Sequence, residues 1–195
     1  MSQSHPRPGT SQPGTSQPGR PRPADSVLAA IGFLLLDVDG VLTDGRIWFD
    51  GTGTECKSFH VHDAAGLAYW HRAGLRSGLL SGRGGPTVER RAHELGVHEV
   101  VLHRLDKGQA LGEILARQQI EPQRVCYVGD DLVDLPVLRA VGFAVTVPEA
   151  RAEVKAVAHH VTERPAGFGA VRDVVELLLR ARGAFDDVLR RYGGP

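Results

Sequence analysis

The sequence IGFLLLDVDGVLTDG occupies residues 31–45 and joins an apolar run, Ile31–Leu36, to two closely spaced acids. A short apolar run bounded by turn-forming residues is typical of a strand buried on both faces, as in a parallel sheet. Asp37 and Asp39 directly follow this run, and open α/β sheets bind their ligands at the carboxyl ends of their strands. Gly40 allows the backbone to turn close to a ligand. The stretch therefore predicts an α/β fold with a candidate site at the end of its first strand.

Further apolar runs alternate with segments of helical periodicity along the chain. This alternation predicts βα units around one parallel sheet, because each helix returns the chain to begin the next strand in the same direction. We therefore expect an α/β protein with an open, doubly wound parallel sheet. Its other strands are predicted at Leu75–Leu80, Glu99–Leu102, Arg124–Val128 and Phe143–Val147, and its helices near Ala68, Glu89, Ile114, Leu135 and Val175.

Two segments depart from this alternation. The β-like runs Arg46–Phe49 and Glu55–Val61 flank the turn-forming sequence Asp50-Gly51-Thr52-Gly53, which predicts a β-hairpin at about residues 45–61, inserted after the first strand. The C-terminal segment Ala170–Arg191 has the amphipathic pattern of a helix that packs on the sheet or on a neighbouring subunit.

Composition limits the classes of protein to which the chain can belong. Its 195 residues suit one ordinary domain, and 42% hydrophobic with 24% charged residues is typical of a globular protein. Lys+Arg and Asp+Glu number 23 each, so the chain lacks the net positive charge with which proteins bind nucleic acid or anionic membranes. No apolar run reaches the ~18 residues of a membrane span. Cys56 and Cys126 are too few for a disulfide framework or a zinc cluster, which favours a reducing, cytoplasmic setting.

Residues 1–24 are rich in Pro, Gly, Ser and Gln and predict a disordered tail before a domain at residues 25–195. Such a composition buries too little apolar surface to offset the entropy of ordering. The tail lacks the apolar stretch of a secretory signal. A transit peptide is the alternative, since arginines occur without acids before Asp25, but the prolines oppose the amphipathic helix that such peptides form.

A second acidic cluster, Asp130, Asp131 and Asp134, follows another predicted buried strand, Arg124–Val128. One of these acids could serve only as the N-cap of the next helix, but three acids are more than capping needs. If this strand lies beside the strand that precedes Asp37, the carboxylates converge. Carboxylate oxygens with open coordination positions suit Mg²⁺.

Two groups suited to phosphate lie between the acidic clusters. Ser81 and Gly82 follow a predicted strand and offer a hydroxyl and an unobstructed amide at the expected start of a helix; the alternative is an ordinary Ser-Gly turn. Lys107 begins a predicted helix, where the helix dipole disfavours a cation, so an anionic partner is expected. A solvated surface lysine is the alternative there.

The order of these groups resembles the four motifs of the haloacid dehalogenase superfamily of phosphohydrolases. Residues from about 28 to 190 further resemble its 3-deoxy-D-manno-octulosonate 8-phosphate phosphatase family, whose members lack a cap domain and carry only a small hairpin. This resemblance implies a cytoplasmic homotetramer acting in lipopolysaccharide sugar synthesis on a phosphorylated sugar acid. It rests on Asp37–Gly45, the predicted hairpin, Phe59–Asp63, Ser81–Arg83, Lys107, Tyr127–Asp134 and Gly167–Val175.

The resemblance implies a catalytic role for four residues. Asp37 is the nucleophile that forms an aspartyl-phosphate, which divides one difficult displacement into two easier ones. Asp39 protonates the leaving alkoxide and then deprotonates the attacking water. Lys107 and the Ser81 hydroxyl neutralise and orient the phosphoryl oxygens.

The resemblance also implies that Mg²⁺ is the cofactor. Its ligands are the side chains of Asp37 and Asp130 and the backbone carbonyl of Asp39, so that the nucleophile and the phosphate do not repel each other. Asp131 and Asp134 are expected to hold the metal ligands in place, or to contact the metal through water.

Substrate contacts are expected at His60, His62, Asp63, Ala64, Gly82, Arg83 and Arg91. The family pattern Asn-Val-Arg-Asp-Gly is His-Val-His-Asp-Ala here, at residues 60–64, so His62 replaces an arginine that would bind a carboxylate with two hydrogen bonds. The strand period of two places His60 and His62 on one face, next to Asp63. A transition-metal site and plain surface histidines are the alternatives for this cluster.

The family's Gly-Gly-x-Gly-Ala-Val-Arg pattern is also altered, to Ala166-Gly167-Phe168-Gly169-Ala170-Val171-Arg172. In the family this region and the chain's end approach a neighbouring subunit's site, which helps a capless enzyme to exclude water.

Three other functions are open at this point. A phosphatase for a related nonulosonate 9-phosphate or for another small phosphomonoester would use the same motifs. A signalling receiver domain carries its phosphoacceptor at the end of the third strand, whereas the third strand here ends at His103-Arg104. A catalytically silent scaffold is disfavoured because every expected catalytic position is occupied.

Overall fold

The computed structural model describes residues 19–194, which form a parallel sheet with helices on both faces. The sheet has six strands in the order β5-β4-β1-β6-β7-β8, and every neighbouring pair is parallel. The predicted α/β class and doubly wound topology are confirmed. The strands are β1 (Phe33–Leu36), β4 (Arg76–Leu80), β5 (Glu99–Val101), β6 (Val125–Val128), β7 (Phe143–Thr146) and β8 (His160–Val161).

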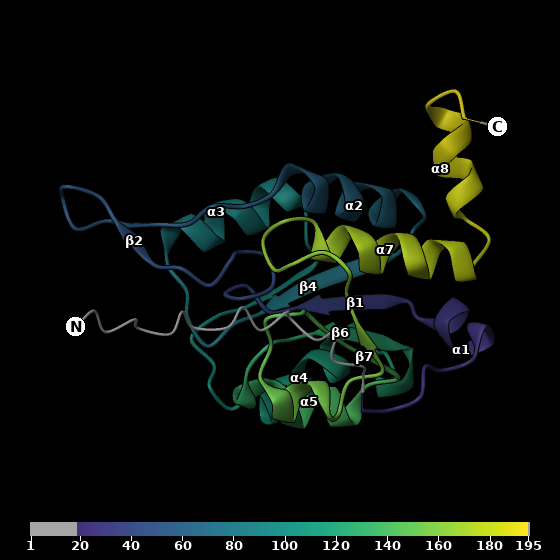
Figure 1. Ribbon diagram of the computed structural model, residues 1–195, viewed down its shortest axis with the longest axis horizontal. Coiled ribbons are helices and arrows are strands. Elements are labelled where there is room, and N and C mark those ends of the chain that lie inside the picture. Colours follow the sequence, from purple (N-terminus) through teal and green to yellow (C-terminus); the bar gives the residue numbers. More distant parts are fainter. Residues whose placement is uncertain (1–18, 195) are drawn as a thin grey trace, which may run out of the picture.

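Helices cover the two faces of the sheet in separate groups, as Figure 1 shows. One face carries α2 (Val61–Arg72), α3 (Pro86–Leu95) and α7 (Ala170–Ala181), and the other carries α4 (Lys107–Gln118) and α5 (Leu135–Ala140). Shorter helices are α1 (Asp25–Ala30), α6 (Ala152–Lys155) and the C-terminal α8 (Phe185–Arg191), together with the 3₁₀ turns η1 (Pro122–Arg124) and η2 (Leu132–Asp134).

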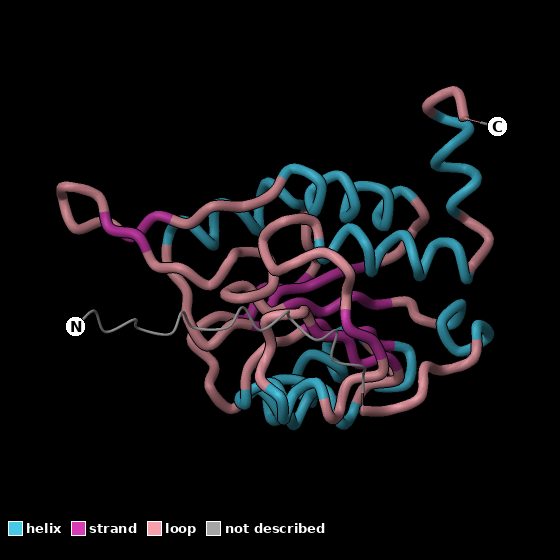
Figure 2. Tube along the Cα trace, viewed as in Figure 1, coloured by secondary structure: helices cyan, strands magenta, loops and turns pink. Residues whose placement is uncertain are grey.

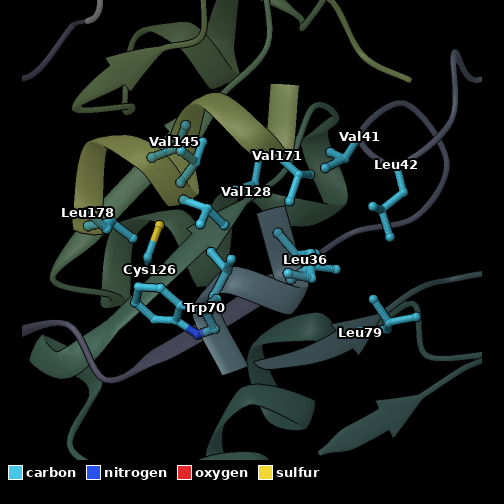
Figure 3. Close-up of a cluster of buried hydrophobic side chains, with 14 of the residues drawn as sticks. Leu36, Val41, Leu42, Trp70, Leu79, Cys126, Val128, Val145, Val171 and Leu178 are labelled. Carbon is cyan, nitrogen blue, oxygen red and sulfur yellow. The ribbon is translucent and has the colours of Figure 1, made fainter. Parts of the chain in front are cut away.

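Strand β1 lies at the centre of the sheet, and its side chains alternate between two hydrophobic clusters. Leu34 and Leu36 join Trp70 and Leu178 on the α2–α7 side, where Figure 3 shows Leu36 and Trp70 among the buried side chains. Phe33 and Leu35 pack on the α4–α5 side. All four residues of β1 are fully buried, which explains the continuous apolar run in the sequence.

The hairpin projects from the body of the molecule at the far left of Figure 1 and forms a separate two-stranded sheet in Figure 2. Its strands are β2 (Trp48–Phe49) and β3 (Glu55–Cys56), joined by a turn in which the Asp50 carboxylate accepts hydrogen bonds from the amides of Thr52 and Thr54. The predicted second strand was too long. Residues 57–60 are not strand, and α2 already begins at Val61.

The C-terminal segment is helical, as its pattern predicted, but it is divided into two helices. Helix α7 ends at Ala181, and α8 spans Phe185–Arg191. Gly183 between them has a φ of 72°, a left-handed conformation that glycine adopts without strain. Figure 1 shows α8 extending away from the sheet, at the end of the molecule opposite the hairpin.

The N-terminal boundary also differs from the predicted one. Residues 1–18 of the predicted tail lie outside the described residues. The backbone amides of Gly19 and Arg20 donate to the carbonyls of Lys155 and Ala158, so the chain joins the folded body before residue 25. The sequence pattern missed α1, α6 and β8 because each is only two to six residues long. Across residues 19–194, the helices are all too short or too polar to cross a bilayer.

Candidate active site

The carboxyl ends of the central strands β4, β1 and β6 surround a pocket of about 340 Å³. This is the edge of the sheet at which the sequence predicted a site. The pocket is lined by eight of the predicted site residues, which come from four separate segments of the chain. Its lining residues are Asp37, Asp39, Gly40, Gly45, Ser81, Gly82, Arg83, Leu105, Lys107, Asp130, Asp131 and Val133.

Three carboxylates converge at the base of the pocket. Asp37, Asp130 and Asp134 each offer one oxygen atom, and these atoms all lie within 4.8 Å of one another. The register of the sheet explains this, because β1 and β6 pair in parallel and the amide of Asp37 donates to the carbonyl of Val128 at 3.0 Å. Gly40 is required here, since a Cβ atom at that position would lie 2.2 Å from an Asp130 carboxylate oxygen.

Asp134 organises this cluster rather than facing an open coordination position. Its Oδ1 accepts hydrogen bonds from Lys107 Nζ at 2.6 Å and from the Tyr127 hydroxyl at 2.7 Å. Its Oδ2 accepts from the backbone amides of Asp130 and Asp131, at 2.9 and 3.1 Å. Asp134 thereby fixes the loop that carries Asp130. Asp131 caps η2, and its Oδ1 accepts from the amide of Leu132 at 2.8 Å.

Asp37 and Asp130 have the properties of cation ligands. Burial raises the pKa of Asp37 to about 7. The positive charge of Lys107 lowers this pKa and the negative charge of Asp134 raises it, but burial has the largest effect. Burial and the nearby charges of Asp37 and Asp134 raise the pKa of Asp130 to about 7 as well. Oδ1 of Asp130 is buried without a hydrogen-bond partner among the described residues. A divalent cation would offset the repulsion between the carboxylates and would give Asp130 Oδ1 a partner, so this donor set fits Mg²⁺.

Lys107 is a buried cation aimed at the nucleophile position. It is the first residue of α4, as predicted, and its Nζ lies 2.7 Å from Asp37 Oδ2 and 2.6 Å from Asp134 Oδ1. Burial lowers the pKa of Lys107, but the two carboxylates outweigh this effect and the net shift is upward. Lys107 therefore stays charged. Lys107 also donates a hydrogen bond to the hydroxyl of Tyr127. The sequence did not indicate this role, because Tyr127 lies within the apolar run of β6.

Ser81 and Gly82 lie in a loop rather than at the start of a helix, which corrects the sequence prediction. Helix α3 begins only at Pro86, so the Gly82 amide does not point from a helix terminus. Ser81 is buried and its Oγ accepts from the Arg83 amide at 3.1 Å. The Ser81 carbonyl accepts from the Arg104 amide, which joins this loop to the one that precedes Lys107.

Asp39 lies in a cluster of charges that includes two residues not singled out from the sequence, Glu55 and Lys57. Lys57 Nζ contacts the Asp39 carboxylate and lies 2.9 Å from Glu55 Oε1. Arg83 donates to Glu55 Oε2 at 2.6 Å, and its Nε lies 3.7 Å from Asp39 Oδ2. The sequence offered no signal for this cluster because Glu55 and Lys57 belong to the hairpin limb, where charged residues are ordinary.

The predicted substrate contacts at residues 60–64 do not line the pocket in this chain. His60 is the N-cap of α2, and its ring nitrogen accepts from the His62 amide at 3.2 Å, so the two histidines do not share a strand face. Asp63 is buried and accepts from the Arg172 amide at 2.9 Å, at the start of α7. Ala64 packs against the hydrophobic core. Among the residues placed by the structure, this segment forms no converging set of three metal ligands.

Arg91 also lies outside the pocket. Its guanidinium stacks over Phe59 at 5.3 Å and lies 3.4 Å from a Glu94 carboxylate oxygen. It lines a separate cavity of about 300 Å³ together with Lys57 and Arg90. Arg83 and Gly82 are thus the two predicted substrate contacts that this chain brings to its own pocket.

Comparison with known proteins agrees with this geometry. The haloacid dehalogenase-like hydrolase family matches residues 87–174. The 3-deoxy-D-manno-octulosonate 8-phosphate phosphatase of Haemophilus influenzae is 37% identical over 80% of this chain and 87% of its own length, and that of Yersinia pestis is 39% identical over 82% and 87%.

Solved structures give the same result. The Moraxella catarrhalis phosphatase of this name, in complex with magnesium, phosphate and 3-deoxy-D-manno-octulosonate (KDO), superposes with a TM-score of 0.84 at 36% identity, over 86% of this chain and 97% of that one. A cobalt-bound form of the Haemophilus influenzae enzyme superposes with a TM-score of 0.78 at 37% identity, over 80% and 92%.

Proposed function

This chain belongs to the 3-deoxy-D-manno-octulosonate 8-phosphate phosphatases, a family of haloacid dehalogenase-like hydrolases, and we infer that it hydrolyses 3-deoxy-D-manno-octulosonate 8-phosphate. The products are 3-deoxy-D-manno-octulosonate and phosphate. The observation that carries this inference is the convergence of Asp37, Asp130 and the charged Lys107 in one pocket of a chain that matches these enzymes over most of their length.

Mg²⁺ is the cofactor of this reaction. The side chains of Asp37 and Asp130 and the backbone carbonyl of Asp39 would hold it. In agreement with this, Oδ1 of Asp130 at the base of the pocket has no hydrogen-bond partner within residues 19–194. When bound, it neutralises phosphate charge, so that a carboxylate can approach phosphorus.

The chain's own residues divide the reaction into two displacements. An oxygen of Asp37 attacks phosphorus and the bond from phosphorus to the sugar oxygen breaks, while Asp39 donates its proton to that oxygen. Water then attacks phosphorus, Asp39 takes the proton of the water, and the Asp37 carboxylate is restored. Lys107 and the Ser81 hydroxyl orient the phosphoryl oxygens throughout.

The residue at position 62 bears on which sugar acid the enzyme accepts. His62 replaces an arginine of the family pattern, and an imidazole cannot bind a carboxylate through two parallel hydrogen bonds. A nonulosonate 9-phosphate, which carries the same kinds of groups on a longer chain, is therefore the second candidate substrate.

A panel of phosphomonoesters separates these candidates. Phosphate release is measured with Mg²⁺ from the octulosonate 8-phosphate, a nonulosonate 9-phosphate and ordinary hexose phosphates. We expect kcat/KM for the octulosonate ester to exceed the others by at least about tenfold. Preference for the nonulosonate ester would keep the phosphatase activity but overturn the assigned substrate. If no ester released phosphate, the assignment of a phosphatase activity would be wrong.

A homotetramer is the assembly that best accounts for the surface of the chain. Ile47, Trp48 and Phe49 are 46%, 57% and 66% exposed on the projecting hairpin, and Phe168 is 54% exposed. Three consecutive exposed apolar residues on a projecting hairpin are typical of an interface. We place His60–Ala64 and Arg91 near a neighbouring subunit's pocket in this assembly, and the enzyme in the cytoplasm, where the unpaired thiols Cys56 and Cys126 are stable.

A further inference from the structure

Four charged side chains of alternating sign form a closed ring at the rim of the pocket. Lys57 contacts Asp39 and Glu55, and Arg83 contacts Glu55 and approaches the other oxygen of Asp39. The four residues come from three separate segments: the catalytic loop after β1, the outgoing limb of the hairpin and the loop after β4. The ring therefore connects the hairpin to the residue that transfers protons in the proposed reaction.

Lys57 is the most enclosed member of the ring. Its side chain is 1% exposed, whereas those of Asp39, Glu55 and Arg83 are 21%, 25% and 49% exposed. Burying an ammonium group is costly unless carboxylates compensate, and Lys57 has two of them. An ordinary anchor for the hairpin would not need a buried cation whose nearest partner is a catalytic carboxylate.

The two oxygens of Asp39 have different surroundings. Oδ1 is held by Lys57 Nζ. Oδ2 is buried and has no hydrogen-bond partner within the described part of the chain, although Arg83 Nε lies 3.7 Å away. The terminal torsion of an aspartate is broad, so a single strong contact on one oxygen fixes the direction of the other. Asp39 lines the pocket, and among the described residues no hydrogen-bond donor occupies its Oδ2, the oxygen that would carry the proton.

We propose that Lys57 is a positioning residue that orients Asp39 toward the leaving oxygen of the substrate, while Glu55 holds Lys57 and Arg83 in place. This inference rests on the proposed phosphatase function. Lys57 does not touch the reacting atoms; it acts through Asp39.

The test uses two substrates with different needs for an acid. The sugar alkoxide of 3-deoxy-D-manno-octulosonate 8-phosphate must be protonated as it leaves, whereas 4-nitrophenolate leaves as a stable anion. The value of kcat/KM reports the steps up to departure of the leaving group. For Lys57→Met we expect kcat/KM to fall by about 100-fold with the sugar phosphate, and to stay within about threefold of wild type with 4-nitrophenyl phosphate.

Two further variants control for a simple loss of structure. Lys57→Arg keeps the charge and should recover most of the activity toward the sugar phosphate. Lys155→Met removes another lysine, whose Nζ donates to the carbonyl of Pro148 outside the pocket, and should leave both substrates unaffected.

A double-mutant cycle with Asp39→Asn decides whether Lys57 acts through Asp39. If it does, Lys57→Met should produce no further loss in the Asp39→Asn background, because the group it positions is already absent. Equal losses on the two substrates, or additive losses in the cycle, would overturn the inference and assign Lys57 to hairpin stability alone. Wild-type chain that hydrolyses neither ester would instead contradict the proposed function itself.

Discussion

Lys107 compensates most of the negative charge at the base of the active site. Its Nζ lies within 2.7 Å of both Asp37 and Asp134, and all three side chains are nearly inaccessible to solvent. We expect Lys107→Met to abolish phosphate release and to lower the free energy of unfolding by about 3 kcal/mol, because two buried carboxylates lose their partner. Urea denaturation at neutral pH measures the second effect, and an unchanged midpoint would show that these carboxylates do not depend on Lys107.

Asp37 and Asp130 couple stability to pH and to Mg²⁺. Each has a pKa of about 7 in the metal-free fold, against an ordinary value of 3.8, so the folded state binds more protons than the unfolded state between these pH values. The two carboxyls therefore stabilise the fold at low pH, and this contribution is lost as the pH rises from about 4 to about 7. Mg²⁺ binds the deprotonated carboxylates and should restore stability most strongly above this window.

Thermal unfolding with and without Mg²⁺ checks this coupling. We expect the increase in Tm caused by Mg²⁺ to be larger at about pH 8 than at about pH 5, by about 3 °C or more. Burial and the nearby Arg20 lower the pKa of His159 to about 4, so this residue makes stability rise with pH, opposite to the two carboxyls. Comparing the protein with and without Mg²⁺ at the same pH cancels the contribution of His159. Asp130→Asn should remove the effect of Mg²⁺, and an equal increase at both pH values would contradict the account.

At the scale of elements, the hairpin shows where the sequence pattern was informative and where it failed. The turn at Asp50–Gly53 was predicted correctly because its chemistry is local. The segment after it looked like a strand, but His60 caps α2 and Asp63 binds the start of α7. The cap is a local contact, but the Asp63 contact depends on the position of α7, more than 100 residues further along the chain, which a local pattern does not encode.

The same hairpin carries the prediction for assembly. Trp48 and Phe49 are exposed and lie in a two-stranded sheet that is separate from the main one. We expect the double substitution Trp48→Ser and Phe49→Ser to convert a tetramer to smaller species, with a loss of activity and little change in the circular dichroism of the fold. Sedimentation velocity measures the mass, and Val100→Ser, at an exposed apolar residue of edge strand β5, is the matched control. A wild-type monomer with full activity would contradict the proposed assembly.

For the molecule as a whole, the sequence was sufficient to predict the sheet and the base of the site. Buried parallel strands are recognisable as apolar runs, and the acids that follow them must meet at one edge of the sheet. Asp37, Lys107 and Asp130 were therefore expected at one edge of the sheet, and all three line the pocket there. The charged ring at the rim was harder to predict, because Glu55 and Lys57 acquire their roles only when the hairpin packs beside the catalytic loop. The same holds at the base for Tyr127, whose hydroxyl binds Asp134.

The central claim is that Asp37 accepts the phosphoryl group of 3-deoxy-D-manno-octulosonate 8-phosphate. The most direct measurement mixes enzyme, Mg²⁺ and this ester, stops the reaction within the first turnover, and reduces any acyl phosphate with borohydride. Peptide mass spectrometry should then find homoserine in place of aspartate at position 37, dependent on substrate. Asp37→Asn, checked to exclude deamidation, should fold normally and give neither the label nor phosphate. Phosphate release without modification of Asp37, or turnover by Asp37→Asn, would contradict the account.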